Sequence, residues 1–177
     1  MSSNDLAARV RNAVRDVPDF PKPGILFKDI TPILRDAVLF NDVVDHLTDL
    51  FSEQQIDVVA AIESRGFIFG APLANALGAA FVPIRKPGKL PSERVRVDYE
   101  LEYGNDAVEA HADAIAPGER VLIVDDVLAT GGTAQAAARL VRELKGELVG
   151  FCIPIELGFL NGRERLNGAP VYSLLTY

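Results

Sequence analysis

Two acidic residues and a short run of small and hydroxyl-bearing residues occur together in one segment of this chain. An apolar stretch, 121–124, leads directly into Asp125 and Asp126. The run that follows contains Ala129, Thr130, Gly131, Gly132 and Thr133. Glycines allow successive backbone N–H groups to converge on an anion, and hydroxyls add donors at the start of a helix, where the dipole favours negative charge. The segment therefore predicts a phosphate-binding loop.

The two aspartates beside this loop need a different partner, because their charge would repel a phosphate. Carboxylates accept hydrogen bonds from sugar hydroxyls and hold hydrated Mg²⁺. We therefore expect Asp125 and Asp126 to face one of these ligands. The alternative is an ordinary strand, turn and helix with an aspartate at the helix cap. A Walker loop is excluded, because neither Gly-Lys-Thr nor Gly-Lys-Ser follows the glycines.

A second anion site is indicated by Arg65, which follows Glu63 and Ser64 where a predicted strand gives way to a helix. The guanidinium offers a fork of donors, and the helix dipole adds to its attraction for an anion. An ion pair between Arg65 and Glu63 on the helix cap is the alternative.

A local cluster of cations lies in a segment rich in Pro and Gly, at Arg85, Lys86 and Lys89. Proline and glycine prevent a regular helix there, so a mobile cationic lid is one interpretation. The other is an ordinary run of solvated surface charges.

The pattern of apolar residues predicts the elements that position these groups. Residues 3–18 and 37–53 have helical spacing. Strands and helices then alternate, with strands at 57–62, 80–84, 120–125 and 147–155 and helices at 67–77 and 133–145. This order predicts an α/β fold with a central, mostly parallel sheet flanked by helices. Between residues 85 and 118, alternating apolar and polar residues predict an antiparallel hairpin.

Length, charge and cysteine content exclude several classes of protein. The 177 residues suit one domain, 1–177, with a core that needs no disulfides. The single cysteine, Cys152, fits a reducing cytoplasmic setting and, in its apolar strand, burial. No apolar stretch is long enough for a membrane span. The net charge of −7 opposes non-specific binding to nucleic acids. His46 and His111 stand alone, so no zinc site is expected.

The acidic pair followed by Ala-Thr-Gly-Gly-Thr resembles the phosphoribosyl-pyrophosphate (PRPP) motif of the type I phosphoribosyltransferases. Other segments, in the same order along the chain, are similar to the adenine-specific branch of that family. These segments are Pro18–Pro21, Pro23–Pro32, Glu63–Gly70, Arg85–Pro91 and Leu101–Gly104.

The resemblance implies the fold of that family, with an N-terminal hood over residues 1–35 and a flexible β flap over 85–105. It implies transfer of a phosphoribosyl group from PRPP to adenine, giving AMP and pyrophosphate, with Mg²⁺ as cofactor. Loop 129–133 would then hold the phosphate, and Asp125 and Asp126 the ribose and, through water, the Mg²⁺. Pyrophosphate would contact Ser64, Arg65, Arg85, Lys86 and Lys89. A cis peptide bond between Glu63 and Ser64 and a homodimeric assembly are also implied.

By the same resemblance, Glu102 is the catalytic acid and base, and Tyr103 supports the flap or the sugar. From the residues alone, Glu102 is an ordinary surface glutamate.

Adenine would be recognised by Leu26, Phe27 and Lys28, with Leu157 on the other side of the pocket. Lys28 departs from family members that carry arginine, because lysine lacks a planar, bidentate fork. Phe27 as a core residue is an equal alternative.

Two other functions stay open at this point. A related phosphoribosyltransferase acting on guanine or xanthine would keep the phosphate loop and change the hood. A PRPP-sensing regulator would need a basic surface or an additional DNA-binding domain.

Overall fold

The computed structural model describes residues 3–101 and 104–177, which form two compact units, Met1–Asp49 and Leu50–Tyr177. The first unit contains the elements α1 (Ser3–Ala13), β1 (Arg15–Pro18), β2 (Leu26–Asp29), α2 (Thr31–Arg35) and most of α3 (Ala37–Phe51). The strands β1 and β2 pair antiparallel. An ion pair between Arg9 and Asp42, with 2.6 Å from Nη1 to Oδ2, connects α1 to α3 within this unit.

The prediction that the first helix continues to Pro18 is wrong. It ends at Ala13, and the next residues form β1, in which Val17 lies opposite Phe27 of β2. The β-branched side chain of Val17 suits a strand, and pairing with β2 supplies the backbone hydrogen bonds that a longer helix would have made.

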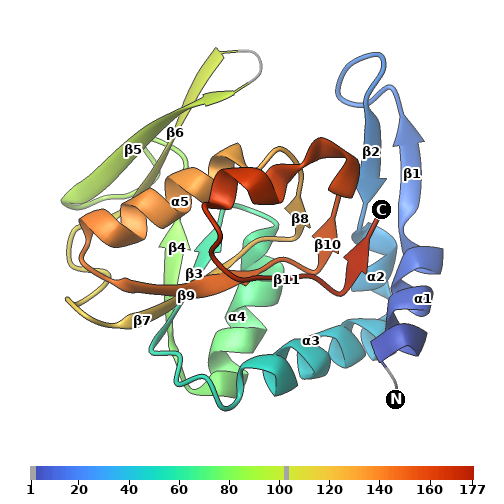
Figure 1. The fold of residues 1–177 in the computed structure, drawn as a ribbon, viewed down its shortest axis with the longest axis horizontal. Coiled ribbons are helices and arrows are strands. Elements are labelled where there is room, and N and C mark those ends of the chain that lie inside the picture. Colours follow the sequence, from blue (N-terminus) through green and yellow to red (C-terminus); the bar gives the residue numbers. More distant parts are fainter. Residues whose placement is uncertain (1–2, 102–103) are drawn as a thin grey trace. The chain divides into compact units, whose positions relative to one another are not determined.

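The second unit is built on five parallel strands in the order β11-β9-β7-β3-β4 (Figure 1). Their bounds are Val58–Ile62 for β3, Ala80–Ile84 for β4, Arg120–Val124 for β7, Glu147–Cys152 for β9 and Val171–Tyr172 for β11. Strands β3 and β7 are buried almost throughout, as expected for strands covered on both faces. The predicted α/β fold with a central parallel sheet is confirmed.

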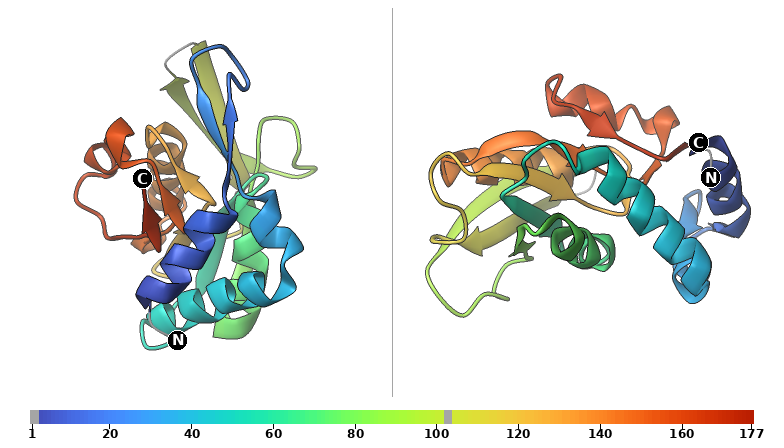
Figure 2. Two further views of the ribbon diagram at one scale, coloured as in Figure 1. Left: turned by 90° about the vertical axis from the view of Figure 1, so that its right-hand side faces the viewer. Right: turned by 90° about the horizontal axis from the view of Figure 1, so that it is seen from below.

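Helices α4 (Gly66–Leu77) and α5 (Gly132–Glu143) cover opposite faces of this sheet, as Figure 2 also shows. Gly70 of α4 packs against Val59 and Ala61, whereas the cluster that includes α5 contains Val58 and Ala60. Alternate residues of a strand point to opposite faces, so the two helices lie on different sides.

The antiparallel hairpin of β5 (Arg94–Leu101) and β6 (Gly104–His111) packs on the α5 side of the sheet (Figure 1). Its inward residues Val97, Tyr99 and Val108 belong to the same apolar cluster as α5. The hairpin expected in this region is confirmed.

A second, smaller parallel sheet has the order β12-β10-β8. Its strands are Val127–Leu128 for β8, Ile155–Glu156 for β10 and Leu175–Thr176 for β12, and the turns η1 (Gly158–Leu160) and η2 (Gly162–Leu166) lie between β10 and β11. The strand predicted at 147–155 is thus divided into β9 and β10. Pro154 lies at the break, where it has no N–H to donate to a neighbouring strand.

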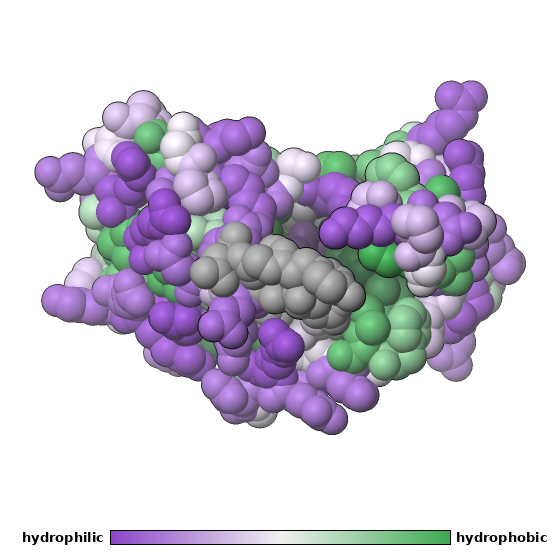
Figure 3. All heavy atoms as spheres, turned by 90° about the horizontal axis from the view of Figure 1, so that it is seen from above, coloured by the Kyte–Doolittle hydropathy of each residue, from purple (hydrophilic) through white to green (hydrophobic). Residues whose placement is uncertain are grey.

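Charged and other polar side chains cover most of the surface visible in Figure 3. Across residues 3–101 and 104–177, no helix has both the length and the apolar character to cross a bilayer.

Candidate functional site

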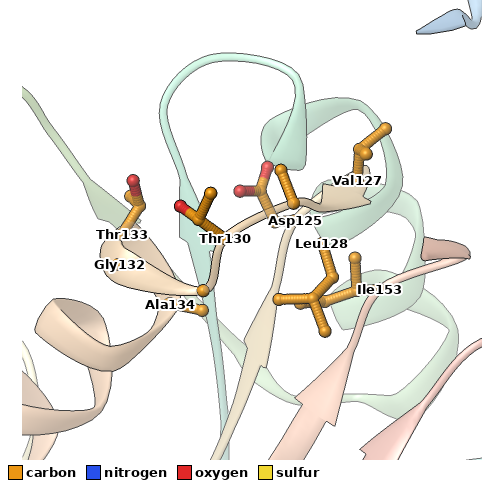
Figure 4. Close-up of a pocket in the computed structure, with 10 residues that line it drawn as sticks. Asp125, Val127, Leu128, Thr130, Gly132, Thr133, Ala134 and Ile153 are labelled. Carbon is orange, nitrogen blue, oxygen red and sulfur yellow. The ribbon is translucent and has the colours of Figure 1, made fainter. Parts of the chain in front are cut away.

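The loop between β8 and α5 encloses a small pocket (Figure 4). It is lined by Asp125, Val127, Leu128, Ala129, Thr130, Gly131, Gly132, Thr133, Ala134 and Ile153. Figure 4 shows the side chains of Asp125, Thr130 and Thr133 rising from the same side of the loop. The pocket volume of about 80 Å³ is far below the roughly 300–1,000 Å³ typical of sites for whole drug-sized ligands. It therefore suits a small charged group such as a phosphate.

Gly131 gives the loop its shape and lies at the N-cap of α5, directly before its first residue, Gly132. Its φ of 81° lies in the left-handed region, which glycine adopts without strain. Gly132, Thr133 and Ala134 of the first turn of α5 line the pocket. The N–H groups of a first helical turn have no partner within the helix, and they carry the positive end of the helix dipole, so this turn suits an anion.

The backbone of the turn η2 packs directly against the backbone of this loop, a contact that the sequence did not reveal. A Cβ on Gly162 would collide with the carbonyl oxygen of Ala129, and a Cβ on Gly131 would collide with the carbonyl oxygen of Gly162. The two backbones touch because both positions lack a side chain. The Asn161-Gly162 pair signals a turn, but nothing local shows which segment that turn contacts.

Asp125 and Asp126 lie at the carboxyl end of β7, next to the loop. Asp126 is 2% exposed, and its backbone N–H donates to Asp125 Oδ1 over 2.9 Å. Burial, together with the charge of Asp126, raises the pKa of Asp125 well above its usual value. Burial also raises the pKa of Asp126, although the charge of Arg65 acts in the opposite direction.

Arg65 pairs with Asp126, with 2.9 Å between Nε and Oδ2, rather than with Glu63. The alternative ion pair between Arg65 and Glu63 is therefore not the arrangement found. The contact forms because α4 starts directly against the end of β7. A Cβ on Gly66 would lie 2.6 Å from Val124 O. The Glu63–Ser64 peptide bond is cis, as the resemblance implies.

Glu63 holds two of the three cations predicted to form a lid. Its Oε2 accepts from Arg85 Nε and from the Lys86 N–H, each over 2.9 Å, and its Oε1 lies 3.3 Å from Lys89 Nζ. The hydrogen bond from Arg85 is the main cause that lowers the pKa of Glu63 to about 2, against a smaller opposing effect of burial. Arg85 and Lys89 are thus ion-paired, not simply solvated.

The third lid cation, Lys86, reaches the hairpin. Its Nζ donates to Asp106 of β6 and, over 2.9 Å, to the Tyr99 hydroxyl of β5. Burial lowers the pKa of Lys86, but the hydrogen bonds to Asp106 and Tyr99 outweigh it, so the pKa is raised. Tyr99 was not predicted as a site residue from the sequence.

The residues predicted to recognise a base belong to two different units. In the first unit, Leu26 is 45% exposed. Phe27 packs edge-on against Phe20, with 5.1 Å between the ring centroids. Lys28 is buried, and its Nζ lies 2.6 Å from Asp16 Oδ1. In the second unit, Leu157 is buried, and its N–H donates to Leu128 O over 2.9 Å.

Glu102 and Tyr103 lie outside the described residues. Cys152 is fully buried, as expected, and burial raises the pKa of its thiol.

The described part of the chain contains no group of three His, Cys, Asp or Glu side chains arranged to hold a metal. Mg²⁺ does not require one, because it keeps several waters and commonly binds through one or two carboxylates together with substrate phosphates. Asp126 Oδ2 is buried, and its contact with Arg65 Nε is an ion pair that lacks the geometry of a hydrogen bond, so among the described residues this oxygen accepts none. The carboxylates of Asp125 and Asp126 therefore fit a hydrated Mg²⁺ that arrives with a phosphorylated substrate.

Comparison with known proteins agrees with this geometry. The family described as the phosphoribosyl transferase domain matches residues 33–168. A protein of Solibacter usitatus called adenine phosphoribosyltransferase is 59% identical over 168 residues, which cover 95% of this chain and 97% of that one.

Two crystal structures of adenine phosphoribosyltransferases are also similar to this chain. The one from Thermoanaerobacter pseudethanolicus superposes with a TM-score of 0.94 at 50% identity, covering 97% of this chain and 99% of the other. The one from Saccharomyces cerevisiae, in complex with adenine and an iminoaltritol bisphosphate, has a TM-score of 0.91 at 46% identity, with the same coverage of 97% and 99%.

Proposed function

The chain belongs to the adenine phosphoribosyltransferase family, and from this premise we propose that it transfers the phosphoribosyl group of PRPP to adenine, giving AMP and pyrophosphate. The observation that carries the proposal is the pocket of loop 129–133 beside Asp125 and Asp126, with Arg65 at hydrogen-bonding distance from the second aspartate. The pocket supplies donors for a phosphate, and the carboxylates supply acceptors for sugar hydroxyls.

We propose that Ala129, Thr130, Gly131, Gly132 and Thr133 bind the phosphate on the ribose. The N–H groups and hydroxyls of this loop are hydrogen-bond donors, and the oxygens of a phosphate are acceptors. Asp125 and Asp126 then hold the ribose hydroxyls and, through water, Mg²⁺. When bound, Mg²⁺ supplies charge neutralisation for the leaving pyrophosphate.

Ser64, Arg65, Arg85, Lys86 and Lys89 form the proposed pyrophosphate site. The leaving group carries several negative charges, so it can compete with Glu63 for Arg85 and Lys89. Arginine and lysine stabilise charge that grows on the leaving oxygens as the bond to the anomeric carbon breaks.

The reaction breaks the bond between the anomeric carbon and the pyrophosphate oxygen and forms a bond from that carbon to an imidazole nitrogen of adenine. The proton on that nitrogen must leave, and Glu102 is the proposed acceptor. The transition state is expected to resemble an oxocarbenium ion, which nearby carboxylates stabilise. Tyr103 is the proposed support for the flap or the sugar. The similarity of Leu101–Gly104 to the family supports both assignments.

Leu26, Phe27, Lys28 and Leu157 are the proposed adenine-binding residues. The exposure of Leu26 supports a role for the β2 segment, since it leaves this apolar side chain available to a ligand. The ion pair of Lys28 with Asp16 favours a structural role for that lysine over direct contact with the base. The proposal includes one domain, 1–177. In that domain, residues 1–35 form a hood and residues 85–105 a flexible flap.

A cytoplasmic homodimer is part of the same proposal. The lone, buried Cys152 supports a reducing compartment. Membership of a family whose members are usually homodimers supports the assembly. Light scattering coupled to size-exclusion chromatography measures the assembly directly, and a monomer at micromolar concentration would contradict it.

The test of function is product formation from PRPP and Mg²⁺ with adenine, guanine, hypoxanthine or xanthine, or with no base. AMP from adenine alone is expected, with Glu102→Ala and Asp126→Ala reducing the rate by at least about 100-fold. Product from a different base would leave the phosphate loop correctly assigned and overturn the adenine-binding segment. Absence of product from every base would overturn the proposal.

A further inference from the structure

The hydroxyl of Tyr99 lies at the meeting point of three segments of the second unit. Its oxygen is 2.9 Å from Lys86 Nζ, 3.1 Å from Asp106 Oδ2 and 3.0 Å from Thr133 Oγ1. Thr133 lines the phosphate pocket, Lys86 follows β4, and Asp106 belongs to β6. This one hydroxyl oxygen thus connects the pocket to a lid cation and to the hairpin.

The chemistry of the three partners restricts how these hydrogen bonds can run. The ammonium of Lys86 can only donate, and the ionised carboxylate of Asp106 can only accept. Tyr99 has a single hydroxyl proton, which it can give to Asp106 or to Thr133 but not fully to both. When the proton points to Asp106, Thr133 must donate to Tyr99, and its own proton is then turned away from the pocket.

A bound phosphate imposes the other arrangement. Its oxygens are acceptors, so Thr133 must donate its hydroxyl proton to the ligand. Thr133 Oγ1 then accepts the proton of Tyr99. Asp106 tolerates this change, because its Oδ2 still accepts from Lys86 and its Oδ1 accepts the Ala107 N–H over 2.8 Å.

We infer that Tyr99 is a positioning residue for the phosphate end of the substrate, an inference that rests on the function proposed above. With ligand bound, its hydroxyl accepts from Lys86 and donates to Thr133, which donates to the phosphate. The four groups form one directed chain of hydrogen bonds from the lid cation to the ligand. The charge of Lys86 polarises each bond of such a chain and strengthens the last one.

The Tyr99 ring has contacts of its own, separate from those of its hydroxyl. The residue is 8% exposed within the apolar cluster that includes Val97, Val108 and α5, and Lys86 Nζ lies 5.5 Å from the ring centroid. A phenylalanine keeps the ring, its packing and the cation–π contact, and removes only the hydroxyl. Tyr99→Phe is therefore a selective test.

The experiment compares Tyr99→Phe with wild type in steady-state assays of AMP formation. We expect KM for PRPP to rise about fivefold to tenfold, as the loss of one hydrogen bond predicts. We expect kcat and KM for adenine to stay within about twofold, because a contact with a non-reacting phosphate contributes equally to ground and transition states. Tyr172→Phe is the matched control, since Tyr172 packs against Phe51 and does not line the pocket.

A purely structural role would give a different result. A partly unfolded Tyr99→Phe enzyme would lose kcat with its KM values unchanged, and that result would overturn the inference. Equal KM values for PRPP in the two proteins would also overturn it. In a Thr133→Val background, Tyr99→Phe should add less than about twofold to KM, because the two residues act through one contact. If Tyr99→Phe instead raises KM for PRPP by about a further fivefold to tenfold in that background, the proposed chain of hydrogen bonds is contradicted.

Direct binding separates this inference from the proposed function. Calorimetric titration with ribose 5-phosphate should show about fivefold to tenfold weaker binding to Tyr99→Phe, whether or not AMP is formed. Weaker binding with no activity on any base would retain the inference and remove the proposed function. If wild type forms AMP normally and Tyr99→Phe binds ribose 5-phosphate as tightly as wild type, the proposed function is retained and the inference is removed.

Discussion

Two carboxylates of this site have pKa values displaced in opposite directions. Glu63 receives hydrogen bonds from Arg85 and from the Lys86 N–H, and its pKa falls to about 2. Burial and the neighbouring charge of Asp126 raise the pKa of Asp125. Ionisation of Glu63 therefore favours the folded state, whereas ionisation of Asp125 opposes it. This difference predicts opposite effects of neutral substitutions on stability.

Asp125→Asn should stabilise the protein at pH 7 and abolish its activity. The amide keeps the shape of the side chain without the cost of a buried charge. We expect a gain of about 1 kcal/mol, or about 2–4 °C in melting temperature for a chain of this length. The pKa of the folded state is raised, so the penalty in wild type develops as pH rises above about 3.8. The gain should disappear as pH falls toward that value.

Melting curves at pH 4, 5.5 and 7 measure this effect, with Asp113→Asn as the control at an exposed aspartate. The prediction is contradicted if, at pH 7, Asp125→Asn lowers the melting temperature by as much as the control substitution or more. That result would show that the charge of Asp125 is well compensated in the folded state.

Glu63→Gln should destabilise the protein, with the opposite dependence on pH. The pKa of Glu63 falls from 4.5 to about 2 on folding, so its contribution is complete above about 4.5 and is lost as pH falls toward 2. We expect a cost of about 1–2 kcal/mol at pH 7, since partial exposure of Arg85 weakens the ion pair. Denaturant unfolding at pH 7 and pH 3 tests this, with Glu143→Gln as an exposed control. A cost that is equal at both pH values contradicts the assignment.

At the scale of elements, the phosphate pocket depends on a turn far along the chain. The turn η2 brings Gly162 against Ala129, and Gln135 of α5 donates to Arg165 O over 2.9 Å. Arg163 anchors the same turn to β10 through Glu156, with 2.7 and 2.8 Å from Nε to the two carboxylate oxygens. The conformation of the loop is therefore determined by contacts between distant segments as well as by its own glycines.

Gly162→Ala should therefore weaken substrate binding as well as stability. The new methyl group would displace Ala129, so we expect a loss of about 1–3 kcal/mol and a rise in KM for PRPP of about fivefold or more. Gly168→Ala is the matched control in the adjoining segment. It has φ of 75° and open space around it, so it costs about 1–2 kcal/mol in backbone strain without touching the pocket. Equal KM values in the two variants would show that η2 does not shape the loop.

The elements that carry a regular pattern were predictable from the sequence. Strands buried on both faces lack alternation, and helix α3 has a clear apolar stripe, so both kinds of element were found near their observed bounds. The short strands β8, β10, β11 and β12 were missed as separate elements, because two residues contain no detectable period. Strand β1 was assigned to a helix, since four residues with one valine at helical spacing cannot reveal their pairing with β2.

Site residues close together in sequence were easier to predict than those joined across the fold. Loop 129–133 and its aspartates form one continuous segment with recognisable chemistry. The pairing of Arg65 with Asp126 was not foreseen, because a nearer carboxylate, Glu63, was available. Tyr99 was missed because its contacts also join segments that are distant in the sequence. Its partner Thr133 is 34 positions away, and a tyrosine in an alternating strand looks like any core residue.

At the scale of the whole molecule, charge determines what an anionic ligand must overcome. The chain carries 18 basic and 25 acidic residues, for a net charge of −7. Long-range electrostatics therefore opposes a phosphorylated sugar, and attraction must come from short-range contacts in the second unit. In a basic protein, stabilisation by a sugar phosphate could reflect general attraction to anions. In this chain it reports a local site.

Ribose 5-phosphate should therefore raise the melting temperature, whereas an equal concentration of adenosine should raise it much less. At about 100 times Kd, a ligand that binds only the folded state contributes about 2.7 kcal/mol, or roughly 5–11 °C here. The shift should persist at 0.15 M salt, where the Debye length is about 8 Å, because contacts within hydrogen-bonding distance are poorly screened. Thr133→Val should reduce it, since the loop then lacks one hydroxyl donor. A larger shift from adenosine than from ribose 5-phosphate would mean that the base, not the phosphate loop, supplies the main anchor.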